Sequence, residues 1–190
     1  MNHSESHQTR LTEHQTLATV DGLIGSLCAV IPDYPKPGVV FRDLTPVFAD
    51  GAAFKAVVNA LVEPFNGQFD AVAGVEARGF LLAAAAAYAT GTGVITVRKA
   101  GKLPREVVAE DYALEYGTAT LELHTTDLAP GSRVLILDDV LATGGTLGAA
   151  ARLFKRCGVE VAGVGVVMEL EGLQGRAALD GYRIESLLRV

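Results

Sequence analysis

The sequence predicts an α/β fold in which a mainly parallel sheet is covered by helices. Continuous apolar runs at residues 70–75, 133–138 and 159–168 are typical of strands that are buried on both faces. Between them, residues 79–89 and 146–157 show the composition and periodicity of helices. Because buried strands alternate with helices along the chain, we expect helices on both faces of the sheet.

Shorter signals complete the expected order of elements. Three prolines and a glycine at 32–38 predict an extended, turning segment, and Asp50 is a suitable N-cap for the helix that follows it. The remaining expected elements are helices at 16–29 and 50–61, a short strand or ordered loop at 39–43, and strands at 93–98 and 183–188.

The stretch at about 99–130 breaks this alternation, because it contains no convincing helix. Residues 107–123 alternate polar and apolar side chains, as expected of an antiparallel ribbon at the surface. A long insertion of this kind over an α/β core is usually a lid. We therefore expect a flexible polar leader at 1–15 and one domain at 16–190 that carries this lid.

Composition narrows the functional classes. A formal net charge of −6 argues against nucleic-acid binding as the main role, since phosphate-backbone binders need a broad basic surface. The N-terminus lacks the apolar core of a signal peptide, and the longest apolar stretch, Phe80 to Ala89, is too short to span a membrane. With only two cysteines and no disulfide framework, a cytoplasmic location is expected.

The strongest functional signal lies at residues 134–146. An apolar strand is expected to end at Asp138 and Asp139, and a loop rich in Gly and Thr then opens a helix. Free N–H groups at such a helix start suit a phosphate. The two carboxylates would repel that phosphate, so we expect them to face sugar hydroxyls or a group bound to Mg²⁺. The combination indicates a sugar phosphate as the ligand.

Three further segments carry candidate ligand-binding side chains. Arg78 could bind an anion at a second strand end, although a surface arginine at a helix start is the plain alternative. A basic cluster at 98–102 could do the same, or it could be a solvated face. Phe41, on the proline-stiffened segment, could stack on a flat heterocycle or belong to the core.

Five motifs resemble the type I phosphoribosyltransferases, from about Ile31 to Leu188. D-D-V-L-A-T-G-G-T at 138–146 is similar to the signature with which the whole family binds phosphoribosyl pyrophosphate (PRPP). The pieces F-R-D, K-L-P and L-E-Y-G are similar to the members that use adenine. In chain order the motifs are Y-P-K-P-G-V-V-F-R-D at 34–43, E-A-R-G-F at 76–80, V-R-K-A-G-K-L-P at 97–104, L-E-Y-G at 114–117 and the signature itself.

The resemblance implies a type I phosphoribosyltransferase fold with an N-terminal hood segment, and a transferase that converts adenine and PRPP into AMP and pyrophosphate in purine salvage. Mg²⁺ would be the cofactor, held mainly by PRPP rather than by protein side chains. It assigns the residues as follows: catalysis to Glu115, Asp138 and Asp139; ribose 5-phosphate binding to the same two aspartates with Ala142, Thr143, Gly144, Gly145 and Thr146; pyrophosphate binding to Glu76, Ala77, Arg78, Arg98, Lys99 and Lys102; adenine binding to Val40, Phe41, Arg42 and Val140.

Some alternatives stay open. Glu115 could exchange a proton with the purine, or it could be a solvated carboxylate of the lid. The base could be guanine or xanthine instead of adenine. A regulator could keep the fold as a PRPP sensor, but no helix-turn-helix fits the leader. Family members are usually dimeric, and the small residues at 79 and 83–87 allow close approach of a second subunit, so we expect a homodimer.

Overall fold

The structure, a computed structural model, describes residues 20–113 and 117–190. The chain divides into two compact units, Met1–Ala60 and Leu61–Val190. None of the helices within the described ranges is long and apolar enough to cross a membrane.

The first unit contains a helix at 20–27, a β-hairpin and two further helices. Strands β1 (Ala29–Pro32) and β2 (Val40–Asp43) pair antiparallel, and α2 (Thr45–Ala49) and α3 (Gly51–Val62) follow. The helix expected to run to residue 29 is shorter, because Ala29 already pairs with Asp43. Asp50 caps α3 as expected, since its Oδ1 accepts a hydrogen bond of 2.8 Å from the Ala53 N–H.

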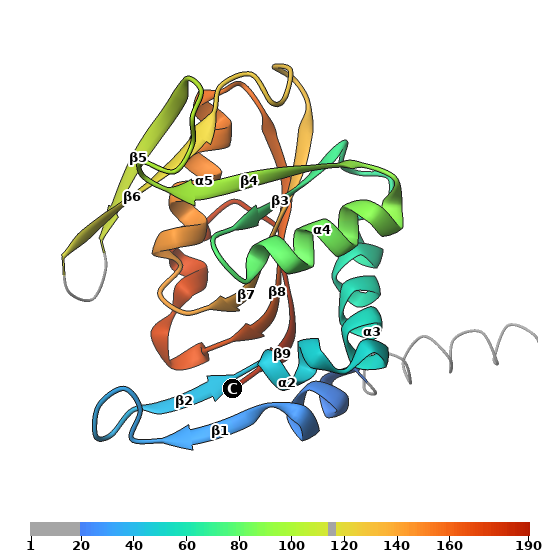
Figure 1. Cartoon of the computed structure of the whole chain (residues 1–190), viewed down its shortest axis with the longest axis vertical. Helices are drawn as coiled ribbons and strands as arrows, with labels where there is room; N and C mark the ends of the chain where they lie inside the picture. Colours follow the sequence, from blue (N-terminus) through green and yellow to red (C-terminus); the bar gives the residue numbers. More distant parts are fainter. Residues whose placement is uncertain (1–19, 114–116) are drawn as a thin grey trace, which may run out of the picture. The chain divides into compact units, whose positions relative to one another are not determined.

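The second unit is built on a seven-stranded sheet in the order β5-β6-β4-β3-β7-β8-β9 (Figure 1). The strands from β4 to β9 in this order run parallel, while β6 and β5 are antiparallel. The strands are β3 (Ala71–Val75), β4 (Gly93–Lys99), β5 (Val107–Ala113), β6 (Thr118–His124), β7 (Arg133–Leu141), β8 (Glu160–Glu169) and β9 (Ile184–Arg189). The helices are α4 (Gly79–Thr90) and α5 (Gly145–Arg156), with 3₁₀ turns η1 (Glu63–Phe65), η2 (Glu171–Leu173) and η3 (Gly175–Leu179).

Apolar side chains from the central strands and from α5 form the core of this unit, including Ile136, Val164 and Phe154, which are fully buried. Helix α4 lies very close to β3 because Gly74 and Gly79 have no side chains where the two elements meet. A Cβ on Gly74 would lie 2.7 Å from the carbonyl carbon of Gly79 and 2.9 Å from the Ala83 Cβ. Of the small residues expected to allow close approach of a second subunit, Gly79, Ala83, Ala86 and Ala87 are buried within the chain, whereas Ala84 is exposed and Ala85 is half-buried.

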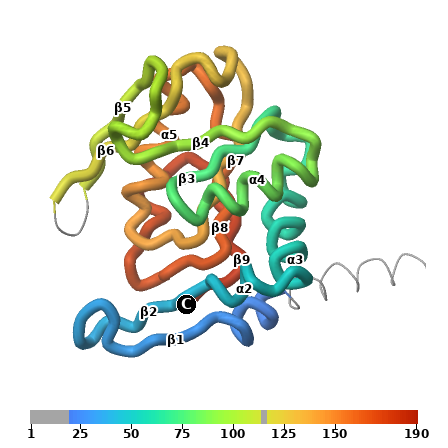
Figure 2. Tube along the Cα trace, viewed as in Figure 1, coloured from blue at the N-terminus to red at the C-terminus, as the bar shows by residue number. Residues whose placement is uncertain are grey.

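The antiparallel ribbon is confirmed at Val107–Ala113 and Thr118–His124, but it is not a separate layer. It extends the main sheet, because Arg98 and Lys99 of β4 pair with Glu122 and Leu121 of β6. Figure 2 shows the ribbon projecting from the rest of the second unit.

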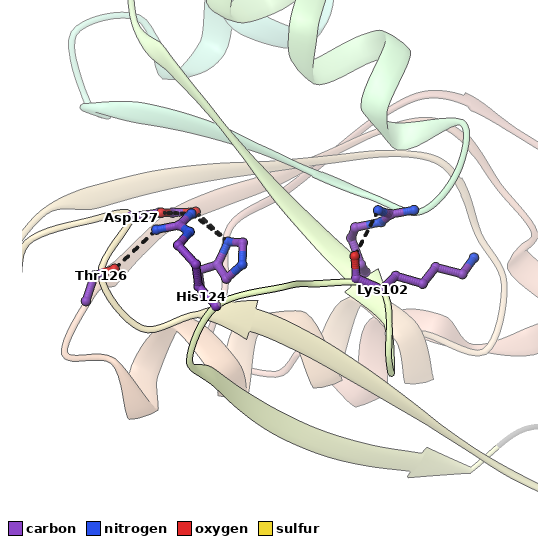
Figure 3. Close-up of polar contacts among 6 residues, drawn as sticks. Lys102, His124, Thr126 and Asp127 are labelled. Atoms are coloured by element: carbon purple, nitrogen blue, oxygen red, sulfur yellow. Dashed lines mark hydrogen bonds and ion pairs between the residues drawn. The ribbon is translucent and has the colours of Figure 1, made fainter.

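The base of the ribbon is held by a polar cluster where β6 ends. Arg105 Nη2 donates to Asp127 Oδ1 at 2.6 Å, and Asp127 Oδ2 lies 3.0 Å from His124 Nδ1 (Figure 3). Strand β6 therefore joins the ribbon to the main sheet, and Arg105, just before β5, fastens the ribbon to the loop after β6.

Candidate active site

A glycine-rich loop between β7 and α5 forms a small concave pocket, open to solvent, with a volume of about 70 Å³. Gly144 has φ +79°, a left-handed conformation that lets the chain turn sharply into α5. The first N–H groups of a helix have no partner within it, so Gly145, Thr146 and Leu147 offer main-chain donors to the pocket. The hydroxyls of Thr143 and Thr146 are further donors on its wall, and such a set of donors suits a phosphate.

Asp138 and Asp139 lie within β7 rather than after it, because the strand continues to Leu141. The expectation that the strand ends at the carboxylates is therefore wrong. Both aspartates are buried, with 9% and 7% of their surface exposed. Asp138 Oδ1 accepts the Asp139 N–H at 2.9 Å and lies beside Gly79, where a Cβ would approach it to 3.0 Å.

Two carboxylates in a buried position disfavour each other's ionisation. Burial raises the pKa of Asp138 well above its ordinary value, and the negative charge of Asp139 raises it further. The positive charge of Arg78 opposes this shift in part. The hydrogen bond from the Asp139 main-chain N–H lowers the pKa of Asp138 more strongly than Arg78 does.

Arg78, in the loop after β3, contacts this pair. Its Nε lies 2.5 Å from Asp139 Oδ2, so the loop after β3 is tied to β7 by an ion pair. The Arg78 side chain is still 39% exposed, which leaves its guanidinium open to an incoming anion. The peptide bond between Glu76 and Ala77, the two residues before Arg78, is cis.

Glu76 binds the basic cluster at 98–102, an arrangement that the sequence did not indicate. Its Oε2 accepts the Lys99 N–H at 3.0 Å and lies 3.5 Å from Arg98 Nε, while Oε1 pairs with the Lys102 ammonium. The hydrogen bond from Lys102 is the main reason that the pKa of Glu76 is lowered. Arg98 Nη1 also donates to the Lys102 carbonyl at 3.3 Å (Figure 3).

The structure therefore brings the two basic clusters together around loop 76–79 and β4. All the residues assigned to pyrophosphate lie there. Because the Glu76 carboxylate already accepts from Lys99 and Lys102, and the Glu76 N–H donates to the Val97 carbonyl at 3.0 Å, residue 76 offers no free donor to pyrophosphate and instead holds the neighbouring cations.

The residues assigned to adenine are divided between the units. Val40, Phe41 and Arg42 form β2 of the first unit, where the Phe41 ring packs edge-on against Tyr34 with centroids 5.3 Å apart. Val140 lies on β7 in the second unit, beside the phosphate pocket. Glu115 lies outside the described residues.

Within residues 20–113 and 117–190, no group of three or more His, Cys, Asp or Glu side chains is arranged to hold a metal ion. Asp138 and Asp139 have the oxygen chemistry that Mg²⁺ prefers. One Asp138 oxygen accepts a main-chain N–H and one Asp139 oxygen is paired with Arg78. The pair fits Mg²⁺ only if another group supplies most of its ligands.

Residues 48–187 match the phosphoribosyl transferase domain family. A curated adenine phosphoribosyltransferase of Arthrobacter sp. (strain FB24) is 78% identical over all 190 residues, which cover the whole of both chains. Among solved structures, the adenine phosphoribosyltransferase of Thermoanaerobacter pseudethanolicus is 46% identical with a TM-score of 0.84, covering 88% of this chain and 98% of its own.

A third similar protein is the adenine phosphoribosyltransferase of Saccharomyces cerevisiae, solved with adenine and an imino-altritol bisphosphate. It is 35% identical, with a TM-score of 0.85, and the match covers 90% of this chain and 99% of that one. The parallel sheet, the glycine-rich loop after β7 and the matched domain define a phosphoribosyltransferase. The matches along the whole chain are more specific: it belongs to the adenine phosphoribosyltransferases.

Proposed function

We propose that the chain transfers the phosphoribosyl group of PRPP to adenine, giving AMP and pyrophosphate in purine salvage. The observation that carries this proposal is the arrangement of three parts. They are the glycine-rich loop with its free N–H groups, the buried Asp138–Asp139 pair in β7, and Arg78, which forms an ion pair with Asp139 and stays partly exposed. PRPP has a phosphate, a ribose and a diphosphate in the same order.

Each part has a role that follows from its chemistry. The main-chain donors at 145–147 and the two threonine hydroxyls bind the 5′-phosphate. Asp138 and Asp139 orient the ribose hydroxyls and stabilise the positive charge that develops at C1′ as the bond to pyrophosphate breaks. Little covalent chemistry falls to the protein, so positioning and fixed charges supply most of the rate acceleration.

The departing pyrophosphate gains negative charge, and the cations around loop 76–79 offset it. Arg78 presents a planar fork to the phosphate oxygens. Glu76 keeps Lys102 and Arg98 beside this loop rather than dispersed in solvent. We propose Mg²⁺ as the cofactor, held mainly by the diphosphate oxygens, with Asp138 and Asp139 nearby; bound there, it would further stabilise the leaving group.

Adenine recognition by β2 follows from the pairing of the hairpin. Pro32 has no N–H, so the Pro32–Val40 pair cannot exchange two hydrogen bonds. Hydrogen-bonded and non-hydrogen-bonded pairs alternate along an antiparallel ladder, so the Val30–Arg42 pair is of the same kind as Pro32–Val40. Val40 and Arg42 therefore direct their main-chain N–H and C=O groups away from β1. No other strand of the described residues pairs with that edge of β2. It can therefore match the 6-amino donor and N1 acceptor of adenine, a pattern that guanine and hypoxanthine reverse.

We also propose that Phe41 stacks on the adenine ring and that Val140 contributes an apolar contact. The ribbon acts as a lid that excludes water from the activated ribosyl centre, and Glu115 exchanges a proton with the purine. These roles rest on the resemblance of the motifs and on the position of the ribbon next to β4.

A homodimer is proposed from the outer face of α4. Leu81 and Tyr88, two turns apart on the same face, are 54% and 92% exposed, and Val94 of β4 is 47% exposed. Exposed apolar patches of this kind mark protein interfaces. Light scattering of the wild-type chain should give twice the 19.9 kDa of the monomer, and Tyr88→Glu should shift the equilibrium toward monomer.

The protein is proposed to act in the cytoplasm, with adenine, PRPP, AMP and pyrophosphate as its partners and with neither nucleic acid nor membrane. The decisive experiment incubates the pure chain with PRPP, Mg²⁺ and one purine at a time. AMP should form from adenine, with guanine and hypoxanthine much poorer substrates. Equal rates with guanine would favour another purine, and PRPP binding without any product would favour a sensor.

A further inference from the structure

A second charged cluster lies at the carboxyl end of β8 and takes no part in the roles described so far. Glu169, only 5% exposed, pairs in register with Leu141, the last residue of β7. The Arg176 guanidinium binds the Glu169 carboxylate in a bidentate manner, with Nε donating to Oε1 at 2.7 Å and Nη2 donating to Oε2 at 2.8 Å. The Ser186 hydroxyl donates to Glu169 Oε2 at 2.5 Å, and Arg189 Nε lies 3.4 Å from the same oxygen.

This cluster remains charged in the folded chain. The hydrogen bonds from Arg176 are the main reason that the pKa of Glu169 is lowered, in opposition to its burial. Arg176 makes further bonds to β9, at 3.0 Å to the Ser186 hydroxyl and 3.4 Å to the Ile184 carbonyl. The turn that carries Arg176, η3, is thus fastened to both β8 and β9.

The same turn lies directly behind the phosphate loop. A Cβ on Gly144 would collide with the Gly175 carbonyl oxygen and lie 2.9 Å from the Ala178 Cβ. A Cβ on Gly148 would lie 3.0 Å from the Ala178 carbonyl oxygen, and one on Gly175 would collide with the Ala142 carbonyl oxygen. Three glycines therefore allow main chain to pack on main chain along the back of the loop.

We infer that the Glu169–Arg176 pair is a positioning element for PRPP: it presses η3 against residues 142–148 and so fixes the main-chain donors that receive the 5′-phosphate. The inference rests on the proposed function of that loop. Neither residue touches the pocket, since its lining comes from residues 138 and 140–147. The effect is transmitted through the contacts of Gly175 and Ala178 with the loop.

Arg176→Lys is the test, because lysine keeps the charge but loses the two-pronged geometry. The matched control is Arg133→Lys, which alters a similar two-pronged pair with Asp70, with distances of 2.8 Å and 3.2 Å, at the opposite end of the same sheet. Arg176→Lys should raise the KM for PRPP about tenfold, since small displacements of binding groups are costly. The KM for adenine should change less than about twofold, and Arg133→Lys should leave both constants near the wild-type values.

Amide hydrogen exchange gives a second readout that needs no catalysis. In Arg176→Lys, peptides covering 142–148 should exchange faster, whereas peptides covering 71–79 should exchange as in wild type. Uniformly faster exchange, or an unchanged loop with an unchanged KM for PRPP, would overturn the inference. If Arg176→Lys does not fold, Ser186→Ala, which removes one hydrogen bond to the same carboxylate, decides it by the same readouts. Wild-type protein that forms no AMP would refute the proposed function, while the exchange result would still decide the role of the pair.

Discussion

Replacing Gly144 with alanine should damage both stability and PRPP binding, because this residue has two separate constraints. Its φ of +79° costs a residue with a side chain about 1–2 kcal/mol. The new Cβ would also collide with the Gly175 carbonyl oxygen and lie 2.9 Å from the Ala178 Cβ. Overpacking of this kind costs roughly 1–3 kcal/mol. The free energy of unfolding should therefore fall by about 2–5 kcal/mol, a large part of the ~5–15 kcal/mol of a typical domain.

Gly131→Ala separates the two contributions. Gly131 has φ +84°, but a Cβ there would meet no atom within 4 Å. Only the conformational cost of about 1–2 kcal/mol should appear in that variant. Urea unfolding of both variants measures the difference, which is the cost of the contact between η3 and the phosphate loop.

Kinetics complete the test. Gly144→Ala should raise the KM for PRPP by about tenfold or more, since ~1.4 kcal/mol of lost binding is a factor of ten. Gly131 lies in the turn before β7, at the opposite end of that strand from the pocket, so Gly131→Ala should leave the KM for PRPP unchanged. Equal losses of stability in the two variants, together with equal KM values for PRPP, would refute the claim that η3 packs against the loop without room for a side chain.

Three further predictions concern the carboxylates and the base. Asp139→Asn should lower kcat/KM by roughly tenfold or more in steady-state assays, since it removes charge beside the ribose; unchanged kinetics would make the pair structural. Arg78→Ala removes the cation that lowers the pKa of Asp138, so the acid limb of the pH–rate profile should move to higher pH; a static limb contradicts this. Phe41→Ala should weaken adenine binding by the ~1–3 kcal/mol of lost stacking, measured as a higher KM for adenine. Arg42→Ala retains its main chain, so it should keep the preference for adenine over hypoxanthine.

The central strands could be predicted from sequence because burial on both faces requires an uninterrupted run of apolar residues. Residues 71–75 are apolar without interruption and are all buried. The end of β7 could not be predicted in the same way. Asp138 and Asp139 look like loop residues, yet both are buried in the strand, since Arg78 and a main-chain N–H offset the cost.

Long-range partners account for most of the remaining differences. Strand β1 is four residues long and exists because Ala29–Pro32 pairs with β2. Glu76 was expected to contact pyrophosphate, and nothing local indicates that Lys99 and Lys102, more than twenty residues later, would bind its carboxylate. The position of Glu169 at the end of an apolar strand was a signal that a cation must be near, but not which one.

The joining of the ribbon to the main sheet constrains how the length of the ribbon can vary among descendants of the sequence. Leu121 and Leu123 of β6 are buried, while Glu122 between them pairs with Arg98 and accepts the Gly101 N–H. Loss of a single codon within β6 would exchange these two faces and expose both leucines. Changes in the length of the ribbon should therefore be inherited as matched additions or losses in both strands, which preserve the register at β4.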